Sequence, residues 1–564
     1  MKKIISILIV LLISFSMANG QVRCLTPLFE QSKLDLYNAF GGSKGPSVGS
    51  KDITLHEVGD TATFWNWDLT VMPPEWVQIA ATCRAVTEYS YIFVANNQWN
   101  VNMDSTDVAM AAYYWEEGTY NDSTAGIYEL DTENFGLPPD EIDNDDHIYI
   151  FYSALGSYQG SVFDGYFSVY NEYTEEEAQQ MGGHSNEVEM FYMSCHPGNP
   201  VSPLRISVLA HEFQHMIHWA ADPNEETWVD EGCAEYAMLL FGVPDPLVDF
   251  PSNPDDDLTV WDSHFSDYIQ TFMFFTYLAD HYGGAEMIYN VVQDPQNSYF
   301  GVQSALYNMG HDITFEQLFV DWAAANFYHG RGGADSPEPD SQYIYYSIDP
   351  PAFSTTDWHT NYPAGPNNRG VNHWAADYIV FGNPNEIEGR LVISFEGNTG
   401  LNYGLGSIEN YNSGIMQADN YYPINNNWTG SVYNFNDFNY FALMVCGPAS
   451  YGNFDYTYEA EITTGINDAP IPDDGFTLGP LYPNPFNQNT LIEFSLPQGR
   501  EASIDIYDIG GRMVRQWHIA GDNKTGQLIW DGKNAMGKDV VSGMYFIRLT
   551  DGEESRVVRG VLLK

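Results

Sequence analysis

The sequence has few cysteines, few basic residues and few long apolar runs, and each scarcity limits what the protein can be. Five cysteines occur in 564 residues without a CxxC pair. Nothing in their spacing indicates a cysteine nucleophile, and their odd number leaves at least one thiol unpaired within the chain. Lys and Arg total 21 against 76 Asp and Glu, and the net charge of −55 repels nucleic acid and anionic lipid. Beyond the N-terminus, no segment reaches the roughly 18 apolar residues of a membrane span.

The excess of acidic residues lies before residue 476. Residues 476–564 hold ten basic and ten acidic side chains, whereas Arg205 is the only Lys or Arg between Arg84 and Arg331. A surface of this charge suits a salty or calcium-containing medium, where repulsion is screened. The run DEIDNDD at 140–146 offers oxygen ligands for Ca2+. It lacks the EF-hand spacing, and most of these acids are expected simply to face solvent.

The N-terminus predicts export. A charged start (MKK), an apolar run from Ile4 to Phe15 and the small residues Ala18 and Gly20 are typical of a secretory signal peptide at 1–20. The apolar run is too short to span a membrane. Residues 21–50 are polar and glycine-rich, and we interpret them as a candidate pro-segment.

The residue pattern of the remaining chain changes along its length. Short aromatic and β-branched runs predict strands at 89–95, 147–152 and 187–194. A helix is expected over 203–221, because Ser202-Pro203 starts it and Asp222-Pro223 ends it. Further helices are expected at 227–241, 267–282 and 315–328. We therefore divide the chain into an α+β domain at 51–335, a β-rich accessory domain at 340–465, a linker at 466–475 and a C-terminal β-domain at 476–564.

The first predicted helix carries a metal-binding pattern. His211 and His215 are four residues apart, so they lie on one helical face and can bind one ion. Glu212 lies beside them, which completes the HExxH motif of zinc enzymes, where the glutamate acts on bound water. Two histidines at this spacing, followed by an acidic helix, favour a metal site over two structural histidines.

A catalytic zinc needs a third protein ligand and one open position. One zinc-peptidase pattern would supply a glycine at 218 and a histidine at 221, but the chain has His218 and Ala221. The following helix offers Glu231 and Glu235, again four residues apart. We assign Glu231 as ligand and Glu235 as the acceptor for a ligand histidine N–H, and the opposite assignment stays open. His218 and Cys233 are expected to be packing residues.

These motifs carry a family resemblance. HExxH followed by WVDEG on the next helix resembles the gluzincin metallopeptidases, and HEFQHMIHW with ETWVDEGCAEYA is most similar to the hyicolysin-like secreted bacterial branch. The resemblance covers about residues 51–330 and implies a zincin-like fold with Glu212 as general base. It also implies Tyr268 as donor to the oxyanion, with His264 as the alternative. The spacer between His215 and Glu231 is shorter than in related enzymes, and the absence of a GxMEN motif disfavours an aminopeptidase.

Peptide substrates commonly lie along an exposed strand edge. The predicted strand at 187–194 is our candidate for that edge, although an ordinary internal strand fits the same residues equally well.

The C-terminal region has a second resemblance. LYPNPF (481–486), IYDIGG (506–511), WDG (530–532) and SGMYF (542–546) resemble the type A sorting domain of the type IX secretion system. The resemblance implies an immunoglobulin-like β-sandwich, passage through the periplasm and the outer membrane, and the secretion machinery as a partner.

Together these patterns predict an exported zinc endopeptidase that acts on proteins or peptides. Two alternatives stay open. One is a surface binding protein or adhesin with a structural or degenerate metal site, although an intact Glu212 argues against degeneracy. The other is a hydrolase of non-peptide amides that uses the same residues.

Overall fold

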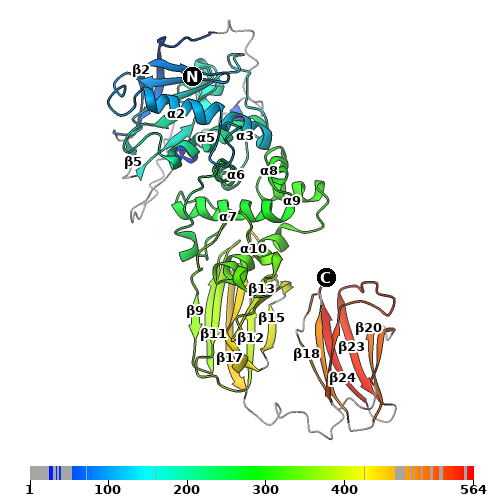
Figure 1. Ribbon diagram of the computed structural model, residues 1–564. Coiled ribbons are helices and arrows are strands. Elements are labelled where there is room, and N and C mark those ends of the chain that lie inside the picture. Colours follow the sequence, from blue (N-terminus) through cyan, green and yellow to red (C-terminus); the bar gives the residue numbers. More distant parts are fainter. Residues whose placement is uncertain are drawn as a thin grey trace, which may run out of the picture. The chain divides into compact units, whose positions relative to one another are not determined.

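The computed structural model divides the chain into two compact units (Figure 1): unit 1 comprises Met1–Phe250 and Thr259–Asp312, and unit 2 comprises Pro251–Leu258 and Ile313–Lys564. The structure describes residues 24–29, 34, 37–39, 54–463 and 477–564, with gaps at 72, 159–160, 425, 433, 483–485, 488, 497–499, 509–511, 520–524 and 552–554. The expected signal peptide, the linker and most of the candidate pro-segment lie outside the described residues.

A six-stranded sheet in unit 1 has the order β1-β2-β3-β4-β8-β7. Its strands are β1 Thr61–Asp68, β2 Glu75–Val86, β3 Ser90–Ala95, β4 Ile148–Ser153, β8 Met190–Ser194 and β7 Gly165–Phe167. The central strands β3, β4 and β8 run parallel and are buried throughout, which explains their continuous apolar runs. The short strand β7 pairs antiparallel with β8 and ends the sheet.

The three strands predicted in this region are confirmed, but our candidate for the substrate edge is wrong. The strand expected at 187–194 begins only at Met190, because Glu187 has a positive φ of 53°. It lies between β4 and β7, so both of its edges are paired. The terminal strand on this side of the sheet is β7, a three-residue strand too short to be recognised from its sequence.

Three helices carry the residues of interest, and all three predictions are confirmed: α5 Pro203–Ala221, α6 Thr227–Phe241 and α7 Phe265–Tyr282. Helix α5 packs against β7 and β8, α6 packs on α5, and α7 packs on α6. Close packing of two helices explains the glycine of WVDEG, which is Gly232. A Cβ at Gly232 would lie 2.2 Å from Phe275 Cδ2, so only glycine lets α6 and α7 approach this closely.

Unit 1 contains further α-helices and a short hairpin. They are α2 Ser105–Glu116, α3 Ile127–Phe135, α4 Glu175–Gln180, α8 Ala285–Val292, α9 Tyr299–Asn308 and the hairpin of β5 Ser157–Tyr158 with β6 Ser161–Val162.

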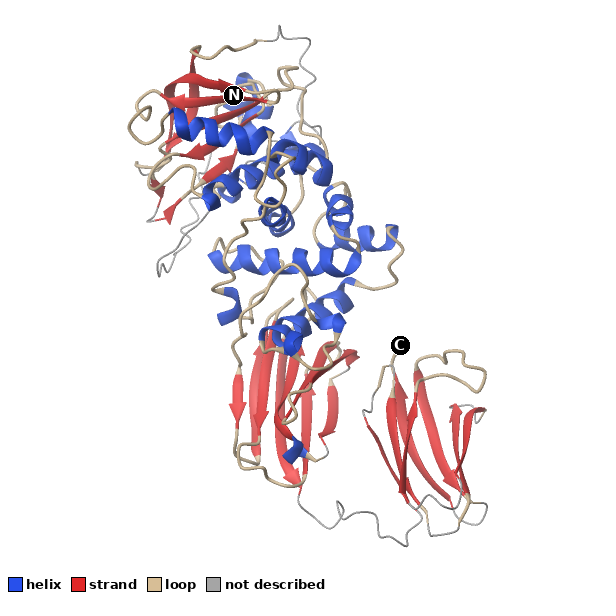
Figure 2. Ribbon diagram, in the orientation of Figure 1, coloured by secondary structure: helices blue, strands red, loops and turns tan. Residues whose placement is uncertain are grey.

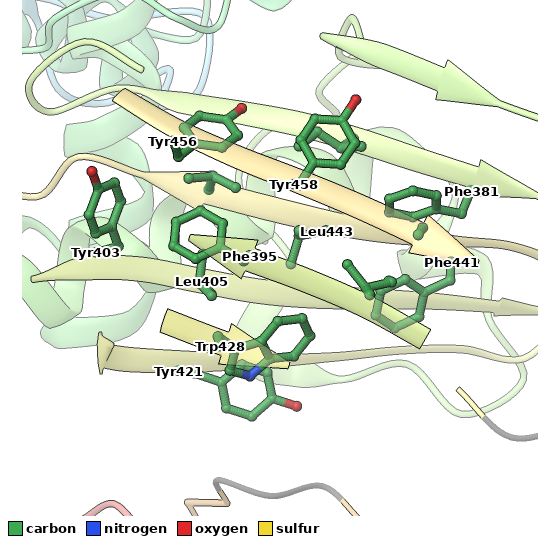
Figure 3. Packing of buried hydrophobic residues seen from close by; sticks show 14 of the residues in the cluster. Phe381, Phe395, Tyr403, Leu405, Tyr421, Trp428, Phe441, Leu443, Tyr456 and Tyr458 are labelled. Atoms are coloured by element: carbon green, nitrogen blue, oxygen red, sulfur yellow. The ribbon is translucent and has the colours of Figure 1, made fainter. Parts of the chain in front are cut away.

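Unit 2 begins with helix α10, Phe315–Gly330, followed by two sheets that enclose one core. The sheet orders are β10-β17-β12-β15 and β14-β13-β16-β11-β9. Aromatic and aliphatic side chains from both sheets meet between them (Figure 3). The strands are β9 Asp357–His359, β10 Ala364–Val371, β11 Ala376–Gly382, β12 Arg390–Gly397, β13 Tyr403–Tyr411, β14 Met416–Ile424, β15 Asn427–Val432, β16 Phe438–Cys446 and β17 Phe454–Thr463.

The helix expected at 315–328 is present, but it clusters with unit 2 and not with the region before it. Its buried face packs on β13, β14 and β16. Our expected boundary at 335 therefore falls after α10, whereas the division of contacts falls before it. An apolar helix does not reveal from its own sequence which sheet it will cover.

The C-terminal region also forms two antiparallel sheets, ordered β18-β19-β22 and β21-β20-β23-β24. Its strands are β18 Thr477–Tyr482, β19 Thr490–Ser495, β20 Ala502–Asp508, β21 Met513–Ile519, β22 Thr525–Trp530, β23 Gly543–Thr550 and β24 Ser555–Leu562. They share a core of their own that includes Trp530 and Tyr545. Figure 2 shows strands dominating the chain from β9 onward. Within the described residues, no helix is both long enough and apolar enough to cross a membrane.

Candidate metal centre

Four potential ligands from three segments converge at one point of unit 1. His211 and His215 project from α5 and Glu231 from α6, while Cys24 comes from the N-terminal segment. One donor atom from each residue lies within 4.8 Å of the others. All four side chains are buried. The structure thus brings together the three ligands predicted from sequence and adds a thiol that the sequence analysis missed.

The spacing of these donor atoms fits a metal ion. His211 Nε2 lies 3.1 Å from His215 Nε2 and 3.2 Å from Glu231 Oε2. His215 Nε2 lies 3.5 Å from both Glu231 Oε1 and Cys24 Sγ. Ligand atoms around a tetrahedral zinc lie about 3.3–3.8 Å apart, given bonds of about 2.0–2.3 Å.

The charges around these donors also fit a cation. Burial alone lowers the pKa of His211, but Cys24, Glu231 and Glu235 outweigh it and raise that pKa well above its ordinary value. Glu231 Oε2, moreover, is buried, and its contact with His211 Nε2 at 3.2 Å lacks the geometry of a hydrogen bond. A divalent cation would compensate both the excess of acidic groups and this buried carboxylate oxygen.

A second layer of acids contacts the two histidines. Asp230 Oδ1 lies 3.1 Å from His215 Nδ1 and 3.1 Å from His218 Nδ1. Glu235 Oε1 lies 3.4 Å from His211 Nδ1, but this contact lacks the geometry of a hydrogen bond, so the orienting role of Glu235 stays a prediction. The sequence analysis missed Asp230, although its position directly before Glu231 was a usable signal. Neither His218 nor Cys233 belongs to the group of converging donors, and both are buried.

Glu212 lies beside the donors and is fully buried. Burial raises the pKa of Glu212 to about 7. Its Oε2 lies 3.5 Å from Cys24 Sγ and accepts a hydrogen bond from Thr26 Oγ1 at 3.3 Å. On the other side, a Cβ at Gly165 would come within 2.9 Å of Glu212 Cγ, so glycine in β7 leaves room for the carboxylate.

The one basic side chain of this region holds the same strand in place. Arg205 on α5 forms a buried ion pair with Asp164, with Nε 2.8 Å from Oδ1. Asp164 directly precedes β7. This contact therefore ties the edge strand to the helix that carries His211 and His215.

The two candidates for an oxyanion donor have different surroundings. Tyr268 is fully buried on α7, and its hydroxyl donates to the backbone carbonyl oxygen of Cys24 at 3.1 Å. Burial raises the pKa of Tyr268 well above its ordinary value, so the hydroxyl stays protonated. His264 is the N-cap of α7, where its backbone N–H donates to Asp267 Oδ2 at 3.0 Å.

A second group of potential ligands lies in the loop that the sequence analysis considered for Ca2+. Asp140, Asp143 and Glu189 place donor atoms within 4.8 Å of one another. Glu189 is fully buried, and its Oε2 has no hydrogen-bond partner among the described residues. Burial raises the pKa of Glu189 to about 11 and that of Asp143 to about 6.

Comparison with known families gives an assignment for the C-terminal region. Residues 480–563 match the secretion system C-terminal sorting domain. The chain carries a type IX sorting domain. Such a domain engages the secretion machinery and directs a protein to the cell surface or the medium, as the sequence motifs predicted. No curated protein matches the chain.

Solved structures offer only partial likenesses. PorZ, a surface component of the type IX secretion system of Porphyromonas gingivalis, is 24% identical over 22% of this chain and 15% of that chain, with a TM-score of 0.13. Latent PorU of the same organism is 15% identical over 35% of this chain and 20% of that chain, with a TM-score of 0.15. The adhesin domain of Epf from Streptococcus pyogenes is 9% identical over 35% of this chain and 71% of that chain, with a TM-score of 0.12.

Proposed function

We propose that this protein is an exported zinc endopeptidase of the gluzincin type, with a zincin-like fold in unit 1. The observation that carries the proposal is the convergence of His211, His215 and Glu231 beside the buried carboxylate of Glu212. Two imidazoles and a carboxylate are the ligand set of zinc peptidases. A structural metal has no need of a further buried acid, Glu212, next to the ligands.

Bound zinc would supply a water of lowered pKa and would polarise the substrate carbonyl. Glu212 takes the proton of the attacking water and then delivers it to the leaving amine nitrogen. A pKa of about 7 suits both steps, because the group can accept and return a proton near neutral pH.

Tyr268 stabilises the negative charge that develops on the carbonyl oxygen. Its hydroxyl already donates to a peptide carbonyl, that of Cys24, at 3.1 Å. The same donor would serve the carbonyl of the bond being cleaved. Glu235 and Asp230 hold the ligand histidines in orientation through the ring nitrogens that face away from the metal.

A second candidate function is a surface binding protein or adhesin with a structural metal. One observation favours it: with Cys24 included, the donor set is complete and leaves no open position, as in structural zinc sites. The two candidates differ in whether the chain can hydrolyse a peptide bond once Cys24 is removed.

We also propose an immunoglobulin-like fold for the sorting domain.

A further proposal is that Asp140, Asp143 and Glu189 bind Ca2+. Three negatively charged carboxylates this close together, one of them the buried Glu189, strongly repel one another unless a proton or a cation compensates their charge. Oxygen ligands of this kind suit Ca2+.

The test of the peptidase is digestion of unfolded casein by the metal-loaded chain with alanine at Cys24, alone and combined with Glu212→Gln. We expect cleavage by the first chain, abolished by a chelator. The Glu212→Gln change should reduce cleavage by about 10²- to 10⁴-fold while zinc content is unchanged. Glu129→Gln, an exposed change on α3, is the control. A metal-loaded chain that cleaves nothing without Cys24 would favour the binding protein.

A further inference from the structure

The described N-terminal segment runs along the open edge of the sheet in unit 1. Cys24 forms a parallel bridge with Gly165 of β7, and the Leu25 N–H donates to the Gly165 carbonyl at 3.1 Å. Thr26 adds a further bond to this strand, since its Oγ1 accepts from the Phe167 N–H at 3.0 Å. Peptides that bind to a sheet edge make contacts of this kind.

The segment is held firmly in place. Cys24, Leu25 and Thr26 are all buried, and Leu25 is fully enclosed. The 3-10 helix η1, Thr26–Phe29, begins at the last of these three residues. Three consecutive buried residues against a strand edge form a specific docked contact, not a loose tail.

The same three residues engage the groups that the proposed reaction uses. Cys24 Sγ lies 3.5 Å from His215 Nε2 and 3.5 Å from Glu212 Oε2. Thr26 Oγ1 donates to Glu212 Oε2, and the Tyr268 hydroxyl donates to the Cys24 carbonyl. Residues 24–26 therefore contact a candidate ligand, the candidate base and the candidate oxyanion donor, which are the groups that a substrate peptide would have to approach.

We propose that Cys24 is the fourth metal ligand and that residues 24–26 are an inhibitor built into the chain, which fills the substrate groove until it is removed. This inference rests on the proposed peptidase function. A thiolate is a strong zinc ligand and would take the position that the attacking water needs. The edge of β7 is accordingly the surface on which an extended peptide substrate docks once the segment has left. Hydrolysis of the chain downstream of Thr26 would free the segment and activate the enzyme.

The ligand assignment is tested on the full chain loaded with Co2+ in place of zinc. A thiolate bound to Co2+ gives an intense near-ultraviolet charge-transfer band. We expect this band in the wild type and its loss in Cys24→Ala. The matched control is Cys195→Ala, which removes another buried free thiol of unit 1 that is outside the donor group. A band that persists in Cys24→Ala overturns the assignment.

The inhibition is tested by casein cleavage with the same chains. We expect Cys24→Ala to cleave at least tenfold faster than the wild type and Cys195→Ala to match the wild type. Equal cleavage by the wild type and Cys24→Ala overturns the proposed inhibition, but it still supports the proposed peptidase function. If no metal-loaded chain cleaves, the peptidase function fails, and the Co2+ spectrum still decides whether Cys24 is a ligand.

A measurement without substitution covers the case in which Cys24→Ala does not fold. The wild-type chain is alkylated with iodoacetamide before and after chelation, and the labelled cysteines are located by peptide mapping. We expect Cys24 to be protected while metal is bound and labelled after its removal. Labelling of Cys24 at the same rate in both states overturns the proposal.

Discussion

Asp230 contacts the candidate metal centre through its Oδ1, which lies 3.1 Å from His215 Nδ1. That contact decides which ring nitrogen of His215 carries the proton, so Nε2 is left to face the other donors. A partner of this kind also raises the basicity of the ligand. Asp230 is buried on α6, and the same oxygen contacts His218.

We predict that Asp230→Ala weakens zinc affinity by about 10- to 100-fold, with a smaller loss for Asp230→Asn, which keeps an acceptor oxygen. The measurement is competition with a chromophoric zinc chelator. Glu226→Gln is the control, since Glu226 is exposed at the start of α6 and its side chain makes no capping bond. Unchanged affinity in Asp230→Ala would show that His215 needs no such partner.

Asp321 gives a pH dependence that is separate from the metal centre. This carboxylate is buried on α10, where it accepts hydrogen bonds from Asn420 and, at 3.2 Å, from Gln317. Burial raises the pKa of Asp321 to about 6, from an ordinary value of 3.8. The folded state therefore binds the proton more tightly than the unfolded state.

A raised carboxyl pKa stabilises the fold at low pH, and this contribution is lost as the pH rises through the folded value. We predict that ionisation of Asp321 lowers the free energy of unfolding of unit 2 by about 3 kcal/mol as the pH rises from about 4 to about 6. Asp321→Asn should remove this contribution to the pH dependence of the unfolding free energy. The measurement is urea unfolding of both chains across this range, and parallel pH profiles would contradict the prediction.

At the level of secondary-structure elements, the packing of α6 on α7 controls the position of Glu231. Gly232 directly follows Glu231 and has no space for a Cβ, because Phe275 of α7 lies against it. We predict that Gly232→Ala destabilises unit 1 by about 1–3 kcal/mol and weakens metal binding, since α6 must move. Adding Phe275→Leu should recover part of the stability. Urea unfolding and zinc competition measure the two effects, and a fully stable Gly232→Ala chain would contradict the prediction.

The start of β8 gives a second prediction at this level. Glu189 directly precedes the strand, and its Oε1 accepts a hydrogen bond from the Ile142 N–H at 3.3 Å. If Ca2+ binds there, it joins the loop at 140–146 to the sheet. We expect Ca2+ at millimolar concentration to raise the melting temperature, and Glu189→Gln to abolish the increase. Mg2+ is the control ion, because it demands a tighter octahedral site. An equal increase in the Glu189→Gln chain would contradict this site.

At the scale of the whole molecule, export and the proposed chemistry depend on different parts of the chain, and the sorting domain serves export. It forms its own core, including Trp530 and Tyr545, and none of its described residues belongs to a group of candidate ligands. We predict that a chain ending at residue 463 stays inside the outer membrane of a host with type IX secretion, but binds zinc like the full chain. Fractionation followed by immunoblotting measures the first point and zinc competition the second. Normal release of the shortened chain would contradict it.

Much of the secondary structure and part of the site were predictable from local patterns. Helices α5 and α6 begin and end where their capping residues indicated, because Pro203, Asp222 and Gly242 act on the backbone next to them. The spacing of His211 and His215 likewise depends only on the turn of one helix. The unit to which α10 belongs was not predictable, since an apolar face can pack on any sheet.

Relations within one helix or one helical pair can be derived from the residue pattern alone: the two histidines, Glu212 beside them and the acids of α6. Local backbone geometry sets these relations, and it is the same in any fold. The place of β7 at one end of the sheet and the approach of Cys24 to His215 across 191 positions depend instead on the folded chain. Strand pairing and burial join residues far apart in the chain, and no local pattern records which partners meet.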